Sequence, residues 1–292
     1  MVSSVVLALM TGCAGFRPTA ERQPTHSAFE RAVVEREHVA SAIAFEARID
    51  ALSKQPAGPE EAWFEVLRGT RSVVVSAPHA TRPFRNGVYR FSDGPGTAAL
   101  AFALHRLCGV TSIHAIRDSP SDPNYYDDND YKRALAGLIT EIRPTIVLDI
   151  HGSHPSRPYD VDLGTMHGRS LLGKPHLGER LVARLRGEGL VNLSDNRFAA
   201  SGPETVTKFV ARFNVPAIQL EVSATRLQPG RGCVEATKNP SACGSIDSHR
   251  FAQLLQALVR YLGDLGQCES PNRSDATQGE STSRPNALNG SP

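Results

Sequence analysis

A regular alternation of short apolar segments with longer helical segments, from residue 72 to residue 266, constrains the fold of this chain more than any other feature. Runs rich in Val and Ile and bounded by Gly or Pro are typical of buried strands. The intervening segments repeat apolar residues every three or four positions, as helices that face a core do. The alternation predicts an α/β fold with a mixed, mainly parallel sheet and helices on both faces. The expected strands are 72–78, 111–116, 145–152 and 215–223, and the expected helices are 96–109, 131–144, 174–189 and 246–266.

The composition is that of an ordinary globular protein. Of 292 residues, 40% are hydrophobic and 21% are charged, which is sufficient for one large core. The net charge of +2 gives no reason to expect a nucleic-acid partner. The last segment is polar and rich in Ser, Asn and Pro, which is typical of a disordered tail. We expect a signal-like segment, a linker with an N-terminal helix, one catalytic domain and a disordered tail, at 1–13, 14–54, 55–268 and 269–292.

The N-terminal segment "MVSSVVLALMTGCAG" is a short apolar run that ends in small residues. It is too short to span a membrane and resembles a secretory signal. Its "MTGC" also resembles a bacterial lipobox, in which Cys13 would carry the lipid. This pattern predicts an exported periplasmic or cell-envelope lipoprotein, with contact to the membrane only through the lipid anchor. The positively charged start of a signal is missing, so a cytoplasmic protein with a mis-assigned start is the alternative.

The cysteines fit an exported protein. If Cys13 carries lipid, four of the five cysteines remain for disulfides. Cys233 and Cys243 lie in one Gly- and Pro-rich loop, so we expect them to pair; any second bridge stays open. The absence of CxxC spacing argues against a metal site made of cysteines.

Two histidines stand at the ends of two expected strands, His79 and His151. Ligands of parallel sheets bind outside the carboxyl ends of the strands, so these side chains are candidates for a metal site. Imidazole nitrogens suit Zn²⁺, although Mn²⁺ or Fe²⁺ would also accept such a site. Asp149 precedes His151 by two residues, so both side chains point to the same side of the strand. We expect Asp149 to accept the second imidazole N–H of His151, with direct metal binding as the alternative.

A catalytic zinc site needs a third protein ligand, which we expect in the loop after His79. Asp93 is the acidic residue of that loop and is our candidate. A turn or N-cap role before the helix at 96–109 explains Asp93 nearly as well. The expected cofactor is therefore one Zn²⁺ per chain, held by His79, His151 and a carboxylate.

Glu221 is a charged residue within an apolar strand. Because strand side chains alternate, Gln219, Glu221 and Ser223 should share a polar face opposite Ile218, Leu220 and Val222. A partly buried Glu near Zn²⁺ has the chemistry of a general base. A structural ion pair, with Arg226 as partner, is the alternative.

Six segments in order give this chain a family resemblance: 76–80, 125–135, 147–158, 161–170, 196–210 and 217–226. Together they resemble the N-formylglutamate amidohydrolase-like family, which is related in fold to zinc carboxypeptidases. The resemblance implies a three-layer zinc hydrolase of linear C–N amide bonds, with His79 and His151 as ligands and Glu221 as base. In the related carboxypeptidases a glutamate ligand follows the first histidine by three residues. Here that position is Arg82, so this ligand has no counterpart.

Several arginines are candidates for binding a substrate carboxylate, because guanidinium matches its geometry. We expect Arg197 foremost, also as a group that stabilises the oxyanion, followed by Arg82, Arg85 and Arg117. The expected partner is thus a small amide or peptide that carries a carboxylate. Two other functions remain open: a catalytically silent protein that binds a carboxylate ligand, and a peptidase or amidase of the cell envelope.

Overall fold

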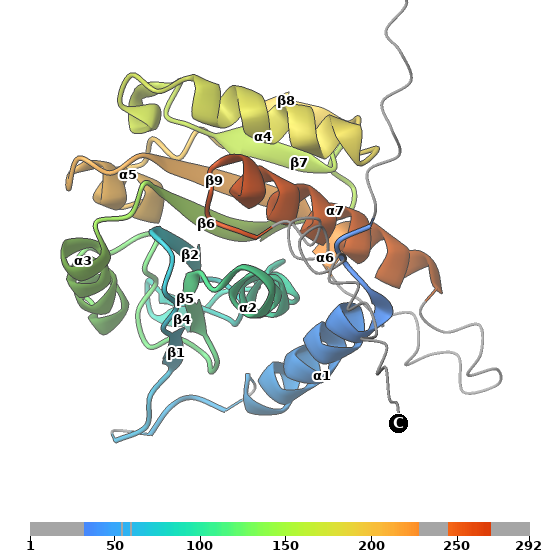
Figure 1. Ribbon diagram of the computed structural model, residues 1–292. Coiled ribbons are helices and arrows are strands. Elements are labelled where there is room, and N and C mark those ends of the chain that lie inside the picture. The colour runs from blue at the N-terminus through green and yellow to red at the C-terminus, as the bar shows by residue number, and fades with distance from the viewer. Residues whose placement is uncertain (1–31, 54, 59, 228–244, 270–292) are drawn as a thin grey trace, which may run out of the picture. The chain divides into compact units, whose positions relative to one another are not determined.

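Strands from the whole length of the domain form one sheet. The structure, a computed structural model, describes residues 32–53, 55–58, 60–227 and 245–269. Within these residues seven strands pair in the order β1-β5-β2-β6-β9-β7-β8 (Figure 1). The strands are β1 (Phe64–Leu67), β2 (Val73–Ala77), β5 (Thr111–Ala115), β6 (Ile146–Ser153), β7 (Val161–Gly164), β8 (Leu193–Asp195) and β9 (Ala217–Ser223). A separate small hairpin consists of β3 (Phe84–Arg85) and β4 (Val88–Tyr89).

The centre of the sheet is parallel, and its flanks are mixed. Strands β5, β2, β6 and β9 run parallel to one another, and these are the four strands that the sequence predicts. β1 pairs antiparallel with β5, β7 pairs antiparallel with β9, and β8 runs parallel to β7. The prediction of a mixed, mainly parallel sheet is confirmed. The flanking strands were not expected, because three or four residues are too few to show a periodic pattern.

Helices cover both faces of the sheet (Figure 1). Helices α2, α4 and α7 contribute to the larger core cluster on one face, and α3 and α5 to the smaller cluster on the other. α1 packs against α2 from outside and adds Val39, Phe45 and Ile49 to the larger cluster. The helices are α1 (Arg36–Leu52), α2 (Thr97–Cys108), α3 (Asp130–Ile142), α4 (His176–Gly187), α5 (Val206–Ala211), α6 (Ala224–Leu227) and α7 (Ser245–Asp264), with a 3-10 turn η1 at Arg169–Leu171.

The described residues belong to one compact unit that begins at residue 32. The N-terminal helix is part of this unit, since its apolar side chains are buried with those of α2. The expected boundaries at 13, 54 and 268 stay predictions. Among the described helices, none is both long enough and apolar enough to cross a membrane.

The face of the sheet toward α3 and α5 changes character along the strands. Near the strand starts it carries apolar side chains, those of Val74, Val147 and Ala217, which pack in the smaller core cluster. Toward the carboxyl ends the same face carries polar side chains, because strand residues alternate between faces. These are Ser76 of β2, Asp149 and His151 of β6, and Gln219 and Glu221 of β9.

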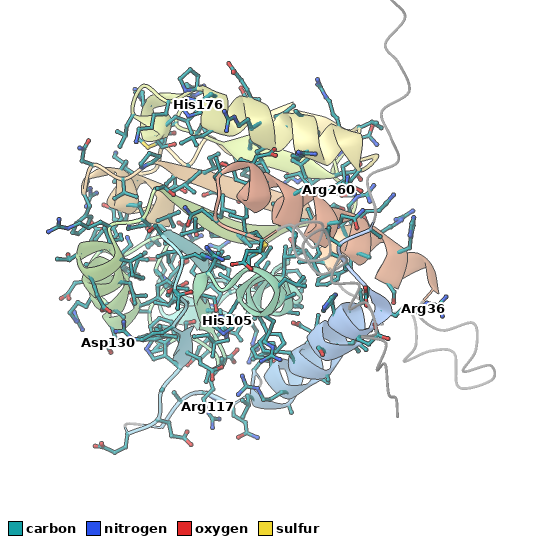
Figure 2. The ribbon with its side chains drawn as sticks, viewed as in Figure 1. Arg36, His105, Arg117, Asp130, His176 and Arg260 are labelled. Atoms are coloured by element: carbon teal, nitrogen blue, oxygen red, sulfur yellow. A yellow bond between two sulfur atoms is a disulfide. The ribbon has the colours of Figure 1, made fainter. Side chains whose placement is uncertain are left out.

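A disulfide joins Cys108, at the end of α2, to Cys268, which follows α7 (Figure 2). It closes a loop of 160 residues and links the segment after α7 covalently to the end of α2. The expected pair of Cys233 and Cys243 and the expected lipidation site Cys13 lie outside the described residues.

Candidate active site

His79 is held by an aspartate that sequence analysis did not single out. Nε2 of His79 lies 2.7 Å from Oδ1 of Asp122, whose side chain is buried. The same Oδ1 accepts the backbone N–H of Asn124 at 2.9 Å, which closes a tight Asx turn. His79 follows β2 and Asp122 follows β5, and these strands are parallel neighbours. The strand-end rule therefore explains why two such distant residues meet.

His151 lies beside Asp149, on the same face of β6. Nε2 of His151 lies 3.2 Å from Oδ2 of Asp149, at ion-pair distance but without the alignment of a hydrogen bond. Asp149 is fully buried and also accepts hydrogen bonds from two hydroxyl groups, those of Ser76 at 3.1 Å and Thr207 at 3.2 Å. The imidazole rings of His79 and His151 are perpendicular, with 4.9 Å between their centroids. The structure thus brings both predicted histidines together, each facing an aspartate.

Glu221 lies beside His151, directly opposite it in the register of β6 and β9. Gln219 donates a hydrogen bond from Nε2 to Oε1 of Glu221 at 3.0 Å. Burial raises the pKa of Glu221, the nearby His151 lowers it, and the carboxylates of Asp149 and Asp162 raise it, with a net value of about 7. A carboxyl group with this pKa can both accept and return a proton near neutral pH.

The expected polar face of β9 is observed, since Ile218, Leu220 and Val222 pack in the larger core cluster on the opposite side. The alternative ion pair of Glu221 with Arg226 is not formed. Arg226 instead donates from Nε to Oδ1 of Asp160 at 2.8 Å.

The charge of His151 depends on its acidic neighbours. Burial disfavours the imidazolium, but the carboxylates of Asp149, Glu221 and Asp122 outweigh burial and raise the pKa of His151 to about 9. His151 and Glu221 therefore each keep a proton to a higher pH than the same groups do in water.

The two histidines offer nitrogens suited to a metal ion, but the set of ligands is incomplete. Nε2 of each ring faces an aspartate, and no hydrogen bond within the described residues engages Nδ1 of either ring. A histidine that binds a metal usually donates its other ring N–H to a carboxylate, as Nε2 of His79 can donate to Asp122. Among the described residues, no three His, Cys, Asp or Glu side chains are arranged to hold a metal together. The residues present therefore fit two of the three expected positions.

Asp93, the expected third ligand, lies next to the site through its backbone. A Cβ atom on Gly152 would lie 1.9 Å from the carbonyl oxygen of Asp93, so only glycine allows the two segments to touch there. This contact places Asp93 beside the residue that follows His151. Its role as a ligand stays a prediction.

The four expected arginines are placed differently from one another. Arg82 binds the buried Asp118 through Nε and Nη2, and Arg117 donates from Nη2 to Glu61 at 3.2 Å. Both guanidinium groups thus already bind carboxylates of the chain itself. Arg197 is exposed, and it is its backbone N–H that contacts Asp162, at 3.1 Å.

Two arginines do face the site. Arg85 lies beside it: Nη1 is 3.7 Å from Oδ2 of Asp122, and the guanidinium group stacks over Tyr125. Arg157, which sequence analysis missed, stacks over Phe198 at 5.2 Å and lowers the pKa of Glu221. The segment "HPSRP" after β6 could have suggested it, because it continues from a strand end.

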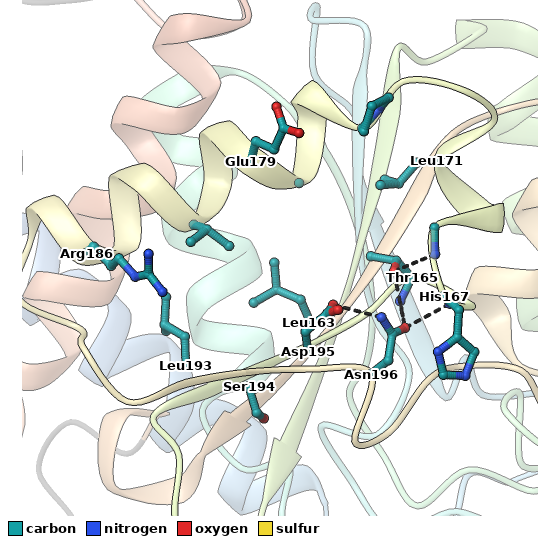
Figure 3. A pocket seen from close by; sticks show the side chains of 14 residues that line it. Leu163, Thr165, His167, Leu171, Glu179, Arg186, Leu193, Ser194, Asp195 and Asn196 are labelled. Atoms are coloured by element: carbon teal, nitrogen blue, oxygen red, sulfur yellow. Dashed lines mark hydrogen bonds between the residues drawn. The ribbon is translucent and has the colours of Figure 1, made fainter.

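A large pocket lies elsewhere, between α4 and the strands β7 and β8 (Figure 3). Its volume is about 570 Å³, and the residues that line it include Glu179 and Arg186 of α4, Leu163 of β7 and Leu193 of β8. None of the residues that line it belongs to the cluster of His79, His151 and Glu221. Leu163 points to the α4 side of the sheet, whereas Asp162, the next residue, points to the side of Glu221. This pocket is therefore not the candidate active site.

Comparison of the sequence with protein-family models and with curated proteins gives no match. Solved structures resemble the fold at low identity. An N-formylglutamate amidohydrolase from Ralstonia eutropha JMP134 is 17% identical, with 70% of this chain and 100% of that chain covered and a TM-score of 0.48. A bacteriophage poly-gamma-glutamate hydrolase is 18% identical, with 68% and 89% covered and a TM-score of 0.42. A metallo-carboxypeptidase from Pseudomonas aeruginosa is 13% identical, with 79% and 69% covered and a TM-score of 0.44.

Similarity at this level assigns neither a substrate nor a cofactor to the present chain. Its own residues must carry any functional conclusion.

Proposed function

We propose that this chain is a metal-dependent hydrolase that cleaves a linear C–N amide bond. One observation carries the proposal: two imidazoles that each face an aspartate, and the carboxyl group of Glu221, meet at the carboxyl ends of three adjacent parallel strands. Ligand sites of open parallel sheets lie outside the carboxyl ends of the strands.

His79 and His151 would hold the metal through Nδ1, with Zn²⁺ as the proposed ion. When bound, such an ion supplies a water whose pKa is lowered to about 7. Asp122 holds Nε2 of His79 by a hydrogen bond, and Asp149 lies at ion-pair distance from Nε2 of His151. Asp93 remains the proposed third ligand, and its backbone contact with Gly152 keeps it near.

Glu221 is the proposed general base. Gln219 holds Oε1 of Glu221, which leaves Oε2 to take a proton from the attacking water. The protonated carboxyl group then returns that proton to the leaving amine. Its pKa of about 7 suits both steps, because a catalytic group works best when its pKa is near the working pH.

Arg157 and Arg85 are the proposed groups that bind a substrate carboxylate. The sequence suggests Arg85 for this role. Arg157 is proposed beside it because this exposed residue stacks on Phe198 and its charge lowers the pKa of Glu221. Such a preoriented guanidinium fits a carboxylate in a bidentate manner. Arg197 remains proposed as a group that binds the carboxylate of a longer substrate, one that extends beyond Arg85 and Arg157.

We also propose that the protein acts outside the cytoplasm, as a lipoprotein anchored through Cys13. The disulfide between Cys108 and Cys268 supports this location, because disulfides persist mainly in oxidising compartments. An amide or peptide of the cell envelope would then be a more accessible substrate than a cytosolic N-formyl amino acid.

Metal analysis combined with one substitution tests the proposal. Purified protein should hold about one zinc per chain and hydrolyse N-formylglutamate, N-acyl amino acids or short peptides. His79→Ala should lose both metal and activity. His176→Ala, at the exposed start of α4 (Figure 2), is the matched control and should keep both.

A catalytically silent protein that binds a carboxylate is the second candidate. The incomplete ligand set within the described residues and the presence of Arg82 at the position of a family ligand favour it. Metal-free protein that binds N-formylglutamate without hydrolysing it would support this candidate and contradict the hydrolase.

A further inference from the structure

One short helix contacts both halves of the candidate site. α5 reaches Asp149 through the side chain of Thr207, and it reaches the turn of Asp122 through the backbone of Val206. We propose that Thr207 and Asn124 are positioning residues, which use the first turn of α5 to fix the two imidazoles relative to each other. This inference rests on the proposed function in one respect, that His79 and His151 are the metal ligands.

We call the two connections that Thr207 and Asn124 make through α5 the bridge, and each connection an arm. The first arm runs from Thr207 to His151. Thr207 is fully buried, and its hydroxyl group donates to Oδ2 of Asp149 at 3.2 Å. The same Oδ2 lies 3.2 Å from Nε2 of His151. Because Thr207 and His151 share one carboxylate oxygen, the position of the hydroxyl group decides where that oxygen faces the ring.

The second arm runs to His79. The backbone N–H of Val206 donates to Oδ1 of Asn124 at 2.8 Å. The backbone N–H of Asn124 in turn donates to Oδ1 of Asp122 at 2.9 Å. That oxygen is the one that lies 2.7 Å from Nε2 of His79. Asn124 thus connects α5 to the first histidine as Thr207 connects it to the second.

The start of α5 is firmly anchored, as such a bridge requires. Val206 and Val210 are fully buried in the smaller core cluster, and the Thr205 hydroxyl group donates to the carbonyl oxygen of Ala200 at 2.7 Å. The buried ammonium group of Lys132 donates to the carbonyl oxygen of Glu204 and lies 2.6 Å from Asp127. Because Val206 and Thr207 are consecutive, the two arms have a fixed separation.

The loss of one arm should shift a ring without unfolding the domain. Asp149 keeps a second hydroxyl donor in Ser76, which also contacts Tyr131. On the other side, Asp122 keeps its contact with Arg85. In a variant of Thr207, the carboxylate of Asp149 therefore keeps a hydrogen-bond donor, Ser76, but is no longer held in its orientation toward His151.

The first experiment substitutes Thr207. Thr207→Val removes the hydroxyl group at nearly constant volume, Thr207→Ser restores it, and Thr140→Val is the control on the exposed side of α3. Two quantities are measured: the ring ¹⁵N chemical shifts of His79 and His151 in metal-free protein, and the dissociation constant of Zn²⁺ by chelator competition. We expect Thr207→Val to shift the His151 ring resonances and to weaken zinc binding about 10–100-fold. Thr207→Ser should stay close to the wild type.

The second experiment substitutes Asn124. Asn124→Ala should shift the ring resonances of His79 and weaken zinc binding by a similar factor, while Asn192→Ala, on the surface, should change neither. The bridge also predicts cross-effects. Asn124→Ala should move His151 resonances and Thr207→Val should move those of His79, because both arms meet in α5.

The outcomes separate this inference from the proposed function. If the wild type binds no zinc and cleaves no amide but the ring shifts change as described, the bridge stands and the hydrolase is wrong. If Thr207→Val gives the same ring shifts as Thr140→Val, the bridge is wrong whatever the protein catalyses. Should Thr207→Val not fold, Asn124→Ala without an effect on either ring would also overturn it.

Discussion

Nε2 of His79 lies 2.7 Å from Oδ1 of Asp122, although 43 residues separate the two in the sequence. The contact exists because β2 and β5 are parallel neighbours, so that the segments after their carboxyl ends meet at one edge. Asp122 is buried and also binds Asn124, which leaves it little freedom to turn away. The orientation of the first histidine is thus decided by a residue on another strand.

Asp122→Asn should leave the fold intact and lower turnover about 10–100-fold, since the amide keeps the shape of the side chain but lacks the negative charge that holds the ring. Steady-state kinetics and zinc content, compared with Asp128→Asn, measure this effect. Asp128 is the control because its side chain is 95% exposed. Equal activity of the two variants would show that Asp122 does not contribute to turnover.

Glu221→Gln should retain zinc but lose most turnover, by about 10²–10⁴-fold, because the amide cannot accept a proton. Elemental analysis and a rate measurement on the same sample separate the two properties. Glu179→Gln, on the exposed side of α4, should behave as the wild type. Wild-type rates in Glu221→Gln would show that another group is the base.

The stability of the metal-free protein should fall as pH rises from about 5 to 9. His151 has a pKa of about 9 against 6.5, so its contribution is full below about pH 6.5 and is lost as pH rises through 9. Glu221 has a pKa of about 7 against 4.5, so the folded chain also holds this proton more tightly and loses that stabilisation between pH 4.5 and 7.

Urea unfolding in the presence of a chelator, at several pH values, measures this slope. Glu221→Gln should reduce the pH dependence of the free energy of unfolding below pH 7, and Asp149→Asn should reduce it above pH 7. A free energy of unfolding that rises over the whole interval would contradict both shifts.

Reduction of the disulfide should destabilise the domain by about 2–5 kcal/mol, since the bond closes a loop of 160 residues. The melting temperature with and without a reductant, in the wild type and in Cys108→Ala with Cys268→Ala, measures the effect. The double variant should melt at the same temperature in both conditions. A wild type insensitive to a reductant that has opened the bond would contradict the prediction.

Arg157→Ala should raise KM for a substrate with a carboxylate and change kcat much less, because the guanidinium group would bind a part of the substrate distant from the reacting bond. The KM of an analogue without the carboxylate should stay unchanged. Arg186→Ala, exposed on α4, is the control. An equal increase of KM for both substrates would exclude a specific carboxylate contact.

The main strands, and the positions of His79, His151 and Glu221 in the candidate site, could be predicted because their signals are local. Alternation of apolar and polar residues within β9 predicts that Glu221 points away from the larger core, and the spacing of Asp149 and His151 places them on one face. Each of these statements depends only on residues within one strand.

The partners of these residues could not be predicted, because they come from other elements. Asp122 and Thr207 reach the histidines only through the order of the strands and the packing of α5. The link between Cys108 and Cys268 likewise depends on where α7 lies against α2.

The sequence by itself determined the α/β class, the four central strands and the position of His79, His151 and Glu221 at or after their ends, since backbone periodicity is a local property. Only the tertiary structure decided which side chains surround them. It placed Arg82 and Arg117 against acidic residues, and it brought Asp122 and Arg157 to the site. The physical reason is that charged side chains pair with whatever opposite charge the packed chain brings within reach, which no local pattern records.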